Sequence, residues 1–292
     1  MGRNCYLKYL CVFDMDGTLL DSNHLIPGRN VEALRDLKKM GVGIVLATGR
    51  SELMTRKYVR ELSLELPIIS NNGSLVVDTK NNKVLYKNTF LSETLIKIIK
   101  YAMLHDKDYF LYTIDKVLYS PDSKKIKIMH YYNSMVPEDE QIEIVKLPSK
   151  IEGVLALLPN NGNSCVFKVL ISDQMEEDSE FFEQLDGVEA ISSQSDSLDI
   201  MPKGSTKGNA LLFLSKYLGV DQQNIFAFGD NYNDLSMLEF AGNAIVPANC
   251  PDEIKLIADF IVDSNDKAGI AQGVYDYVIP RINREFSTNK KN

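Results

Sequence analysis

The stretch "VFDMDGTLLDS" (residues 12–22) ends a short apolar run with two aspartates, Asp14 and Asp16. Side chains two residues apart on a strand point to the same face, so both carboxylates converge on one spot if the strand reaches Asp16. Carboxylates that close repel each other unless a cation or a shared proton relieves the repulsion. The stretch therefore predicts a site that binds a cation or handles a proton.

Composition and charge limit the class of protein. The chain has 292 residues, of which 45% are hydrophobic and 25% charged, as in a soluble globular protein of one large or two ordinary domains. Its formal net charge of -8 argues against nucleic acid or an anionic membrane as the main partner. A small anionic substrate stays possible, because a bound metal ion reverses the local field.

The cysteines indicate the compartment. The chain has four of them, without C-x-x-C spacing: Cys5, Cys11, Cys165 and Cys250. This pattern favours reduced thiols over a disulfide framework or a zinc site, and predicts a cytoplasmic protein. No apolar run approaches the length that spans a membrane, so no membrane partner is expected. The sequence leaves the oligomeric state open.

Both ends of the chain alternate apolar strands with helix-like stretches. The first part has strand-like runs at residues 10–13 and 42–47, and the pattern returns after about residue 194 with "KGNALLFLSKYLG" and "NIFAFGD". Between them, strand-like runs surround helix-like stretches as in an antiparallel α+β unit. We therefore predict an α/β protein: a Rossmann-like core of parallel strands with helices on both faces, at residues 1–83 and 194–292, and an inserted α+β cap at 84–193.

Polar residues follow the predicted strands or open a predicted helix. They are Asp14, Asp16, Thr48, Asn71, Asn72, Lys207, Asp230, Asn233 and Asp234. Ligands of open parallel sheets gather at the carboxyl ends of the strands, so these side chains are expected at one edge. Carboxylates, amides, a hydroxyl and an ammonium form a hard-oxygen cation site beside an anion site. Magnesium with a phosphate suits such a set.

Four short motifs carry a resemblance to a known family. "DMDGT", "TGR", "KG" and "GDNYND" occur in the order of the motifs of the haloacid dehalogenase-like (HAD) phosphatase superfamily. The long insertion after "ISNNG" resembles the Cof-type subfamily with a type IIB cap. The resemblance covers essentially the whole chain. It implies a magnesium-dependent phosphatase that hydrolyses a small phosphorylated metabolite, such as a sugar phosphate or similar phosphomonoester, through an aspartyl-phosphate.

The resemblance also implies a role for each motif residue. Asp14 is the expected nucleophile and Asp16 the expected general acid/base. The expected magnesium ligands are the side chains of Asp14 and Asp230 and the backbone carbonyl of Asp16. Phosphate or substrate contacts are expected from Met15, Thr48, Gly49, Lys207 and Asn233. Asp234 and Asn72 are expected to support the site, Asp234 beside the metal or by orienting the lysine.

Several of these positions have alternative interpretations. Asn71 and Asn72 are typical of a turn that shapes a site. Lys203 lies one helical turn before Lys207, and the "KG" that opens the apolar helix favours Lys207. Arg50 is expected to pair with an acid or cap a helix. The three histidines lie outside the motifs and are expected on the surface or in loops: His24, His105 and His130.

Two other functions stay open. A phosphotransferase or mutase, like the phosphomannomutase relatives of the family, passes the phosphoryl group from the same aspartate to a sugar hydroxyl. A regulatory protein would bind a phosphometabolite without turnover, although the intact Asp14 and Asp16 pair argues against this. A dinucleotide site is disfavoured, because no predicted strand is followed by G-x-G-x-x-G.

Overall fold

The computed structural model describes residues 7–158, 165–194 and 196–289, so Cys5 lies outside the described residues. Its central sheet has five parallel strands in the order β14-β13-β12-β1-β2. Their bounds are β1 Leu10–Phe13, β2 Gly43–Leu46, β12 Ile225–Phe228, β13 Asn243–Pro247 and β14 Phe260–Val262. An isolated parallel bridge from Ala47 to Ile69 brings β3 (Ile68–Ser70) beside β2.

Helices cover both faces of this sheet, because alternate strand residues point to opposite sides. Phe13 packs in a cluster with residues of α1 (Gly28–Lys39), α10 (Gly269–Gly273), the π-helical turn Val274–Val278 and α11 (Ile279–Asn289). Its neighbour Val12 packs on the other side with α7 (Lys207–Leu218), α8 (Leu235–Phe240) and α9 (Asp252–Lys255). The predicted parallel core with helices on both faces is confirmed.

A small antiparallel sheet lies where the core meets the inserted segment. It contains β3, β4 (Leu75–Asp78) and β5 (Lys83–Lys87), in that order. The short 3-10 turn Glu52–Met54 and α2 (Arg56–Glu61) connect β2 to this sheet. These segments place the loop after β2 against the inserted unit.

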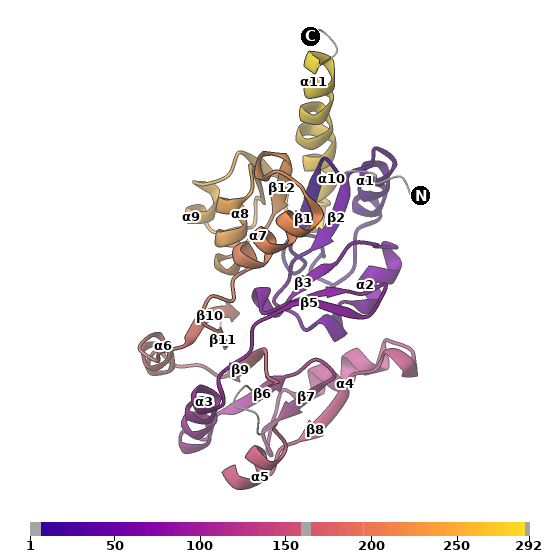
Figure 1. Ribbon diagram of the computed structural model, residues 1–292. Helices are drawn as coiled ribbons and strands as arrows, with labels where there is room; N and C mark the ends of the chain where they lie inside the picture. The colour runs from indigo at the N-terminus through magenta and orange to yellow at the C-terminus, as the bar shows by residue number, and fades with distance from the viewer. Residues whose placement is uncertain (1–6, 159–164, 195, 290–292) are drawn as a thin grey trace.

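The inserted unit, which we call the cap (residues 88–202), is built on a six-stranded sheet of order β10-β11-β9-β6-β7-β8. The strands are β6 Asp108–Tyr112, β7 Lys116–Tyr119, β8 Glu143–Lys146, β9 Lys168–Ser172, β10 Val188–Gln194 and β11 Ser197–Pro202. One face packs against α3 (Ser92–Leu104), α5 (Ile151–Ala156) and α6 (Glu176–Glu183). The other face packs against α4 (Ile126–Ser134) and the core residue Leu53. Figure 1 shows the cap below the core, joined to it by two chain crossings.

Strand pairing favours domain boundaries later than those predicted from the sequence. β5 pairs with β4 beside the core, whereas β11 pairs with β9 and β10 in the cap. We therefore propose boundaries after Lys87 and after Pro202, in place of 83/84 and 193/194. The apolar run "SLDIMP" could form a strand of either sheet, because its pattern is the same in both cases. Only its pairing with β9 and β10 favours the cap.

Within the described part of the chain, Cys11, Cys165 and Cys250 are free thiols. None of the helices described is both long and apolar enough to cross a membrane.

Candidate active site

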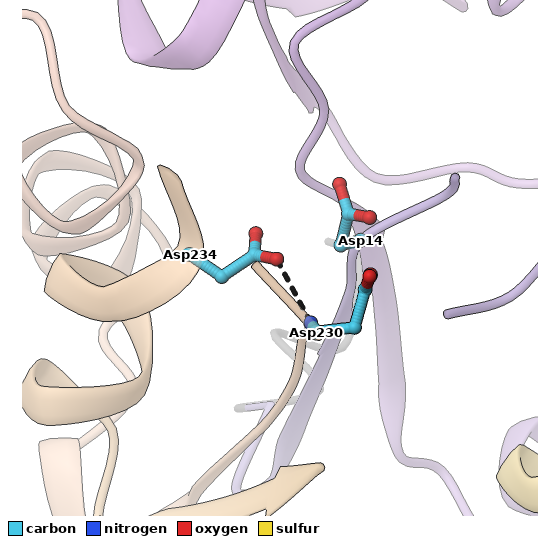
Figure 2. Close-up of side chains that lie close together, drawn as sticks. All are labelled: Asp14, Asp230 and Asp234. Atoms are coloured by element: carbon cyan, nitrogen blue, oxygen red, sulfur yellow. Dashed lines mark hydrogen bonds between the residues drawn. The ribbon is translucent and has the colours of Figure 1, made fainter. Parts of the chain in front are cut away.

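Three aspartates meet at the carboxyl ends of two adjacent strands. Asp14 follows β1 and Asp230 lies just beyond β12, and these strands pair in parallel register. Asp234 ends the short 3-10 turn at residues 232–234. One oxygen from each carboxylate lies within 4.8 Å of the others, and Figure 2 shows the three side chains converging. The predicted edge of the sheet therefore does gather these acids.

Lys207 is the cation of this cluster. Its ammonium lies 2.5 Å from Asp14 Oδ1 and 2.6 Å from Asp234 Oδ1, and the side chain is fully buried. Burial lowers the pKa of this lysine, but the two carboxylates outweigh that effect and raise it above its usual range. Lys203, in contrast, is exposed and its backbone amide bonds to the carbonyl of Gly187. The choice of Lys207 over Lys203 agrees with this geometry.

The acidic cluster holds more negative than positive charge. Burial, then the nearby charge of Asp234, raises the pKa of Asp14 well above its usual range, although Lys207 opposes the shift. The same two causes raise the pKa of Asp230 to about 7, while a hydrogen bond from the Thr18 hydroxyl, 2.7 Å long, lowers it. Three carboxylates share one ammonium, so a divalent cation would relieve their repulsion.

The donor set fits Mg²⁺, which prefers carboxylate and carbonyl oxygens. Asp234 already accepts from Lys207 and from the amides of Asp230 and Asn231, at 3.0 and 3.1 Å. Both oxygens of Asp234 therefore already accept hydrogen bonds, from the lysine or from backbone amides. Asp14 and Asp230 are then the carboxylates better placed to bind a metal. The supporting role of Asp234 stays a prediction.

Gly17 lets the turn after β1 approach Asp230 closely. Its φ of +81° lies in the left-handed region, and a Cβ at this position would be 2.4 Å from Asp230 Oδ2. A side chain here would therefore both strain the backbone and displace the carboxylate.

Asp16 lies apart from the cluster of three aspartates and pairs with Arg50. The guanidinium donates from Nε and Nη2 to the two carboxylate oxygens, at 2.7 and 2.5 Å, and His24 Nδ1 lies 3.3 Å from Oδ1. The Asp16 side chain is 44% exposed; its partial desolvation raises its pKa, but hydrogen bonds from His24 and Arg50 outweigh that effect and hold the pKa below its usual range. Asp16 is thus ionised here, whereas its predicted role as an acid needs the protonated form.

The loops after β2 and β3 form the neighbouring side of the site. Thr48 is buried, and its hydroxyl oxygen accepts from the Arg50 amide at 3.1 Å. Asn72 accepts from Asn233 at 3.0 Å, and a Cβ on Gly49 would lie 2.8 Å from the same oxygen. Asn72 therefore links two predicted motif loops.

Asn71, the other asparagine of "ISNNG", behaves differently. Its side chain is fully buried, and within the described residues its amide oxygen and nitrogen have no hydrogen-bond partner. Its backbone amide bonds to the carbonyl of Arg50 at 2.9 Å. Both asparagines have positive φ, as expected of the predicted turn.

Sequence reasoning missed several residues around the site. Thr18, which bonds to Asp230, is hidden in the first motif, and His24 lies beside Asp16 in the loop that follows it. Two cap residues, Lys168 and Asp199, contact the core loops. The available signal was a charge inside an apolar strand, as in "CVFKVLIS" and "SLDIMP".

Comparison with known proteins identifies the family. Residues 11–274 match the family described as haloacid dehalogenase-like hydrolase. Pyridoxal phosphate phosphatase YbhA of Escherichia coli is 27% identical, over 91% of this chain and 97% of its own length. A 5-amino-6-(5-phospho-D-ribitylamino)uracil phosphatase of Bacillus subtilis, YwtE, is 29% identical over 88% and 94% of the two chains.

One relative is much longer. The chloroplastic endoribonuclease YBEY of Arabidopsis thaliana is 29% identical over 92% of this chain, which spans 47% of that protein's length.

Solved structures share the whole architecture. A haloacid dehalogenase-like hydrolase from Bacteroides thetaiotaomicron has a TM-score of 0.78 and 25% identity, covering 92% of this chain and 99% of its own. The HAD subclass IIB sugar phosphatase BT4131 has the same TM-score with 21% identity, covers 92% and 99% of the two chains, and so shares the fold of core and cap. The chain therefore belongs to the haloacid dehalogenase-like hydrolase family, as its four motifs predict.

Proposed function

We propose that this protein is a magnesium-dependent phosphatase that hydrolyses a small phosphorylated metabolite through an aspartyl-phosphate on Asp14. The observation that carries the proposal is the group of Asp14, Asp230 and Asp234, with the buried ammonium of Lys207 between the carboxylates of Asp14 and Asp234. Such a group has the charge and oxygen donors for a cation and a phosphate together.

In this proposal Asp14 is the nucleophile and Asp16 is the general acid and base. The Asp14 carboxylate attacks phosphorus while the bond to the leaving oxygen breaks, and Asp16 donates a proton to that oxygen. Asp16 then takes a proton from the water that attacks the aspartyl-phosphate, which releases inorganic phosphate and restores Asp14. Asp16 must leave or loosen its contacts with Arg50 to do this.

The other motif residues bind charge and fix orientation. The side chains of Asp14 and Asp230 and the backbone carbonyl of Asp16 would hold Mg²⁺, which when bound neutralises phosphate charge. Lys207, Asn233, the Thr48 hydroxyl and the amides of Met15 and Gly49 would contact phosphate or substrate. The buried Lys207 is held by two carboxylates, so its position does not depend on the substrate.

The substrate class rests on relatives and on the cap. Proteins similar to this chain are named for pyridoxal phosphate, a phosphoribitylamino-uracil and sugar phosphates. A cap seated on the core excludes water from the reaction and contacts the part of the substrate beyond the phosphate. We propose a small phosphomonoester of this kind, hydrolysed in the cytoplasm.

A panel of phosphomonoesters tests the proposal. Phosphate release is measured with Mg²⁺, with a chelator, and with Mg²⁺ restored. We expect hydrolysis of several small phosphomonoesters that the chelator abolishes and added Mg²⁺ recovers. Release without an acceptor sugar would exclude obligatory transfer of the mutase type. Tight binding of phosphorylated ligands with no turnover on any substrate would overturn the proposal in favour of a sensor.

A further inference from the structure

A buried ion pair lies on the face of the cap sheet that meets the core. Lys168 begins β9, and Asp199 of β11 pairs with Leu170, so the two charged side chains are diagonal neighbours on one face. Their side chains are 6% and 3% exposed, and the ammonium lies 3.1 Å from Asp199 Oδ1. It also lies 4.7 Å from the ring centroid of Tyr112, the residue of β6 that is paired with Lys168. Such burial costs desolvation energy, so stability alone gives little reason for the pair.

The lysine reaches beyond the cap to the loop that follows β2. Lys168 Nζ donates to the carbonyl of Gly49 at 2.8 Å. The same peptide unit carries the amide of Arg50, which donates to Thr48 Oγ1 at 3.1 Å. A trans peptide is planar with its C=O and N–H pointing in opposite directions, so fixing one end aims the other. Lys168 therefore helps direct the Arg50 amide toward the hydroxyl of Thr48.

This contact decides what the hydroxyl can do. A threonine hydroxyl has one hydrogen to donate and lone pairs to accept. When its oxygen accepts from the Arg50 amide, the remaining hydrogen points elsewhere and is available to a phosphate oxygen. Thr48 is the residue expected to bind phosphate in this way.

The aspartate of the pair reaches a second loop. Asp199 Oδ2 accepts from Asn72 Nδ2 at 3.0 Å, and Asn72 Oδ1 accepts from Asn233 Nδ2 at 3.0 Å. Asn233 lies between Asp230 and Asp234 in the fourth motif. The cap pair thus contacts the second-motif loop directly and the fourth-motif loop through one asparagine.

We infer that Lys168 is a positioning residue: with Asp199 it orients the Gly49–Arg50 peptide, and through it Thr48, when the cap is seated on the core. The phosphate-binding loop is then fully ordered only while the cap is in contact, which links cap closure to phosphate binding. The inference rests on the proposed phosphatase function for its kinetic consequence. Its effect on phosphate binding is independent of turnover.

The chain offers a matched control. Lys107 and Asp178 form another buried lysine–aspartate pair in the cap, 2.6 Å apart, with side chains 11% and 1% exposed. Asp178 also accepts from Tyr101 and from the Met175 amide, which both belong to the cap. Lys107→Met therefore breaks a comparable pair without touching a core loop.

The test compares Lys168→Met with Lys107→Met. We measure kcat and KM on the best phosphomonoester, the Kd for inorganic phosphate by titration with Mg²⁺ present, and the melting temperature. Both variants should melt lower than the wild type. Lys168→Met should lose about 10- to 100-fold in kcat/KM and bind inorganic phosphate at least several-fold more weakly, because a misplaced contact at the reacting group costs about that much. Lys107→Met should keep both values within about twofold of wild type, because this pair shares no partner with the site and distant sites couple only weakly.

A double-mutant cycle with Thr48→Val tests the route. If Lys168 acts through Thr48, then Lys168→Met should change phosphate affinity little once Thr48 has lost its hydroxyl. Fully additive losses, or equal losses in the Lys107→Met control, would overturn the inference.

Two further measurements keep the outcomes separate. Should Lys168→Met fail to fold, Asp199→Asn keeps the shape of the aspartate but removes the charge that holds Lys168. Wild-type phosphate affinity in that variant would then overturn the inference. If the wild type hydrolyses nothing but binds phosphate, the proposed function fails, and the comparison of phosphate Kd values still decides the role of Lys168.

Discussion

The guanidinium of Arg50 donates a hydrogen bond to each carboxylate oxygen of Asp16, at 2.7 and 2.5 Å. This bidentate pair holds Asp16 in its ionised form, whereas donation of a proton to a leaving group needs the acid form. An anionic phosphate ester bound nearby favours the protonated form. The state of Asp16 is therefore set by competition between Arg50 and the substrate.

The leaving group should reveal the role of Asp16. We expect Asp16→Asn to slow hydrolysis of an alkyl phosphate by at least about 100-fold, the usual contribution of general acid catalysis. Hydrolysis of an aryl phosphate with a good leaving group should lose much less, because that group departs without a proton. The measurement is kcat/KM on both esters. Equal losses on the two would contradict the general-acid assignment.

Removal of the guanidinium should move the pH profile. Arg50 lowers the pKa of Asp16, so Arg50→Met should raise that pKa. An essential acid is lost as the pH rises through its pKa, so the alkaline fall of kcat/KM on an alkyl phosphate should shift to higher pH. The same profile on an activated aryl phosphate is the control and should shift less. An unchanged pH profile on the alkyl ester would show that the contact with Arg50 does not control the pKa of the catalytic acid.

Asp14→Asn should abolish turnover and preserve the fold. The two side chains are nearly isosteric, but the amide is not a nucleophile, so kcat should fall by at least about 1,000-fold, more than one lost stabilising contact usually costs. Asp122→Asn, at an exposed position, is the matched control and should keep wild-type activity. Activity and circular dichroism are measured on both variants. Substantial residual turnover in Asp14→Asn would point to another nucleophile.

The metal-free protein should become less stable as the pH rises toward neutrality. Burial and Asp234 raise the pKa of Asp230 to about 7, so between its unfolded pKa of about 4 and pH 7 the folded state binds more protons than the unfolded state. Stability from this group is complete below pH 4 and is lost as the pH rises to about 7. The raised pKa of Asp14 acts in the same direction.

Added Mg²⁺ should counteract this loss, since its ligands must be deprotonated. We therefore expect Mg²⁺ to raise the melting temperature more at pH 7.5 than at pH 5. Melting curves at both pH values, with Mg²⁺ or a chelator, measure the effect. Asp230→Asn should remove most of it. A shift by Mg²⁺ that is the same at both pH values, or that survives in Asp230→Asn, would place the metal elsewhere.

Substitution of two glycines with similar backbone conformations can distinguish backbone strain from disruption of the site. Gly17 and Gly41 have φ values of +81° and +77°, so alanine at either position should destabilise the fold by about 1 kcal/mol. A Cβ on Gly41 meets nothing within 4 Å, but one on Gly17 collides with Asp230. Gly17→Ala should therefore also weaken Mg²⁺ activation, whereas Gly41→Ala should not. Melting temperature and the Mg²⁺ dependence of kcat/KM test this, and equal Mg²⁺ responses would argue against the close approach.

The sequence predicted the core and its acidic cluster because local pattern specifies both. Short apolar strands followed by polar residues indicate a parallel sheet, and parallel strands end at one edge. Asp14, Asp230 and Asp234 therefore had to meet once β1 and β12 paired. The sequence also placed Lys207 at the start of an apolar helix, where α7 begins.

Contacts between segments far apart in the chain could not be predicted from the sequence. The run at residues 197–202 has the same apolar pattern in either sheet, and pairing with β9 and β10 assigned it to the cap. The Arg50 contact with Asp16 depends on how two loops approach each other. So does the contact of Lys168 with Gly49, which joins residues 119 positions apart.

The sequence by itself determined the family, the core fold and which acids follow the strands of the core, because motif order and strand–helix alternation are local properties of the chain. Only the tertiary structure decided which distant groups reach the predicted site: Arg50 contacts Asp16, and Lys168 of the cap contacts the carbonyl of Gly49. The physical reason is that hydrogen bonds and ion pairs act over a few ångströms, and closing a loop over the core determines which groups come that near.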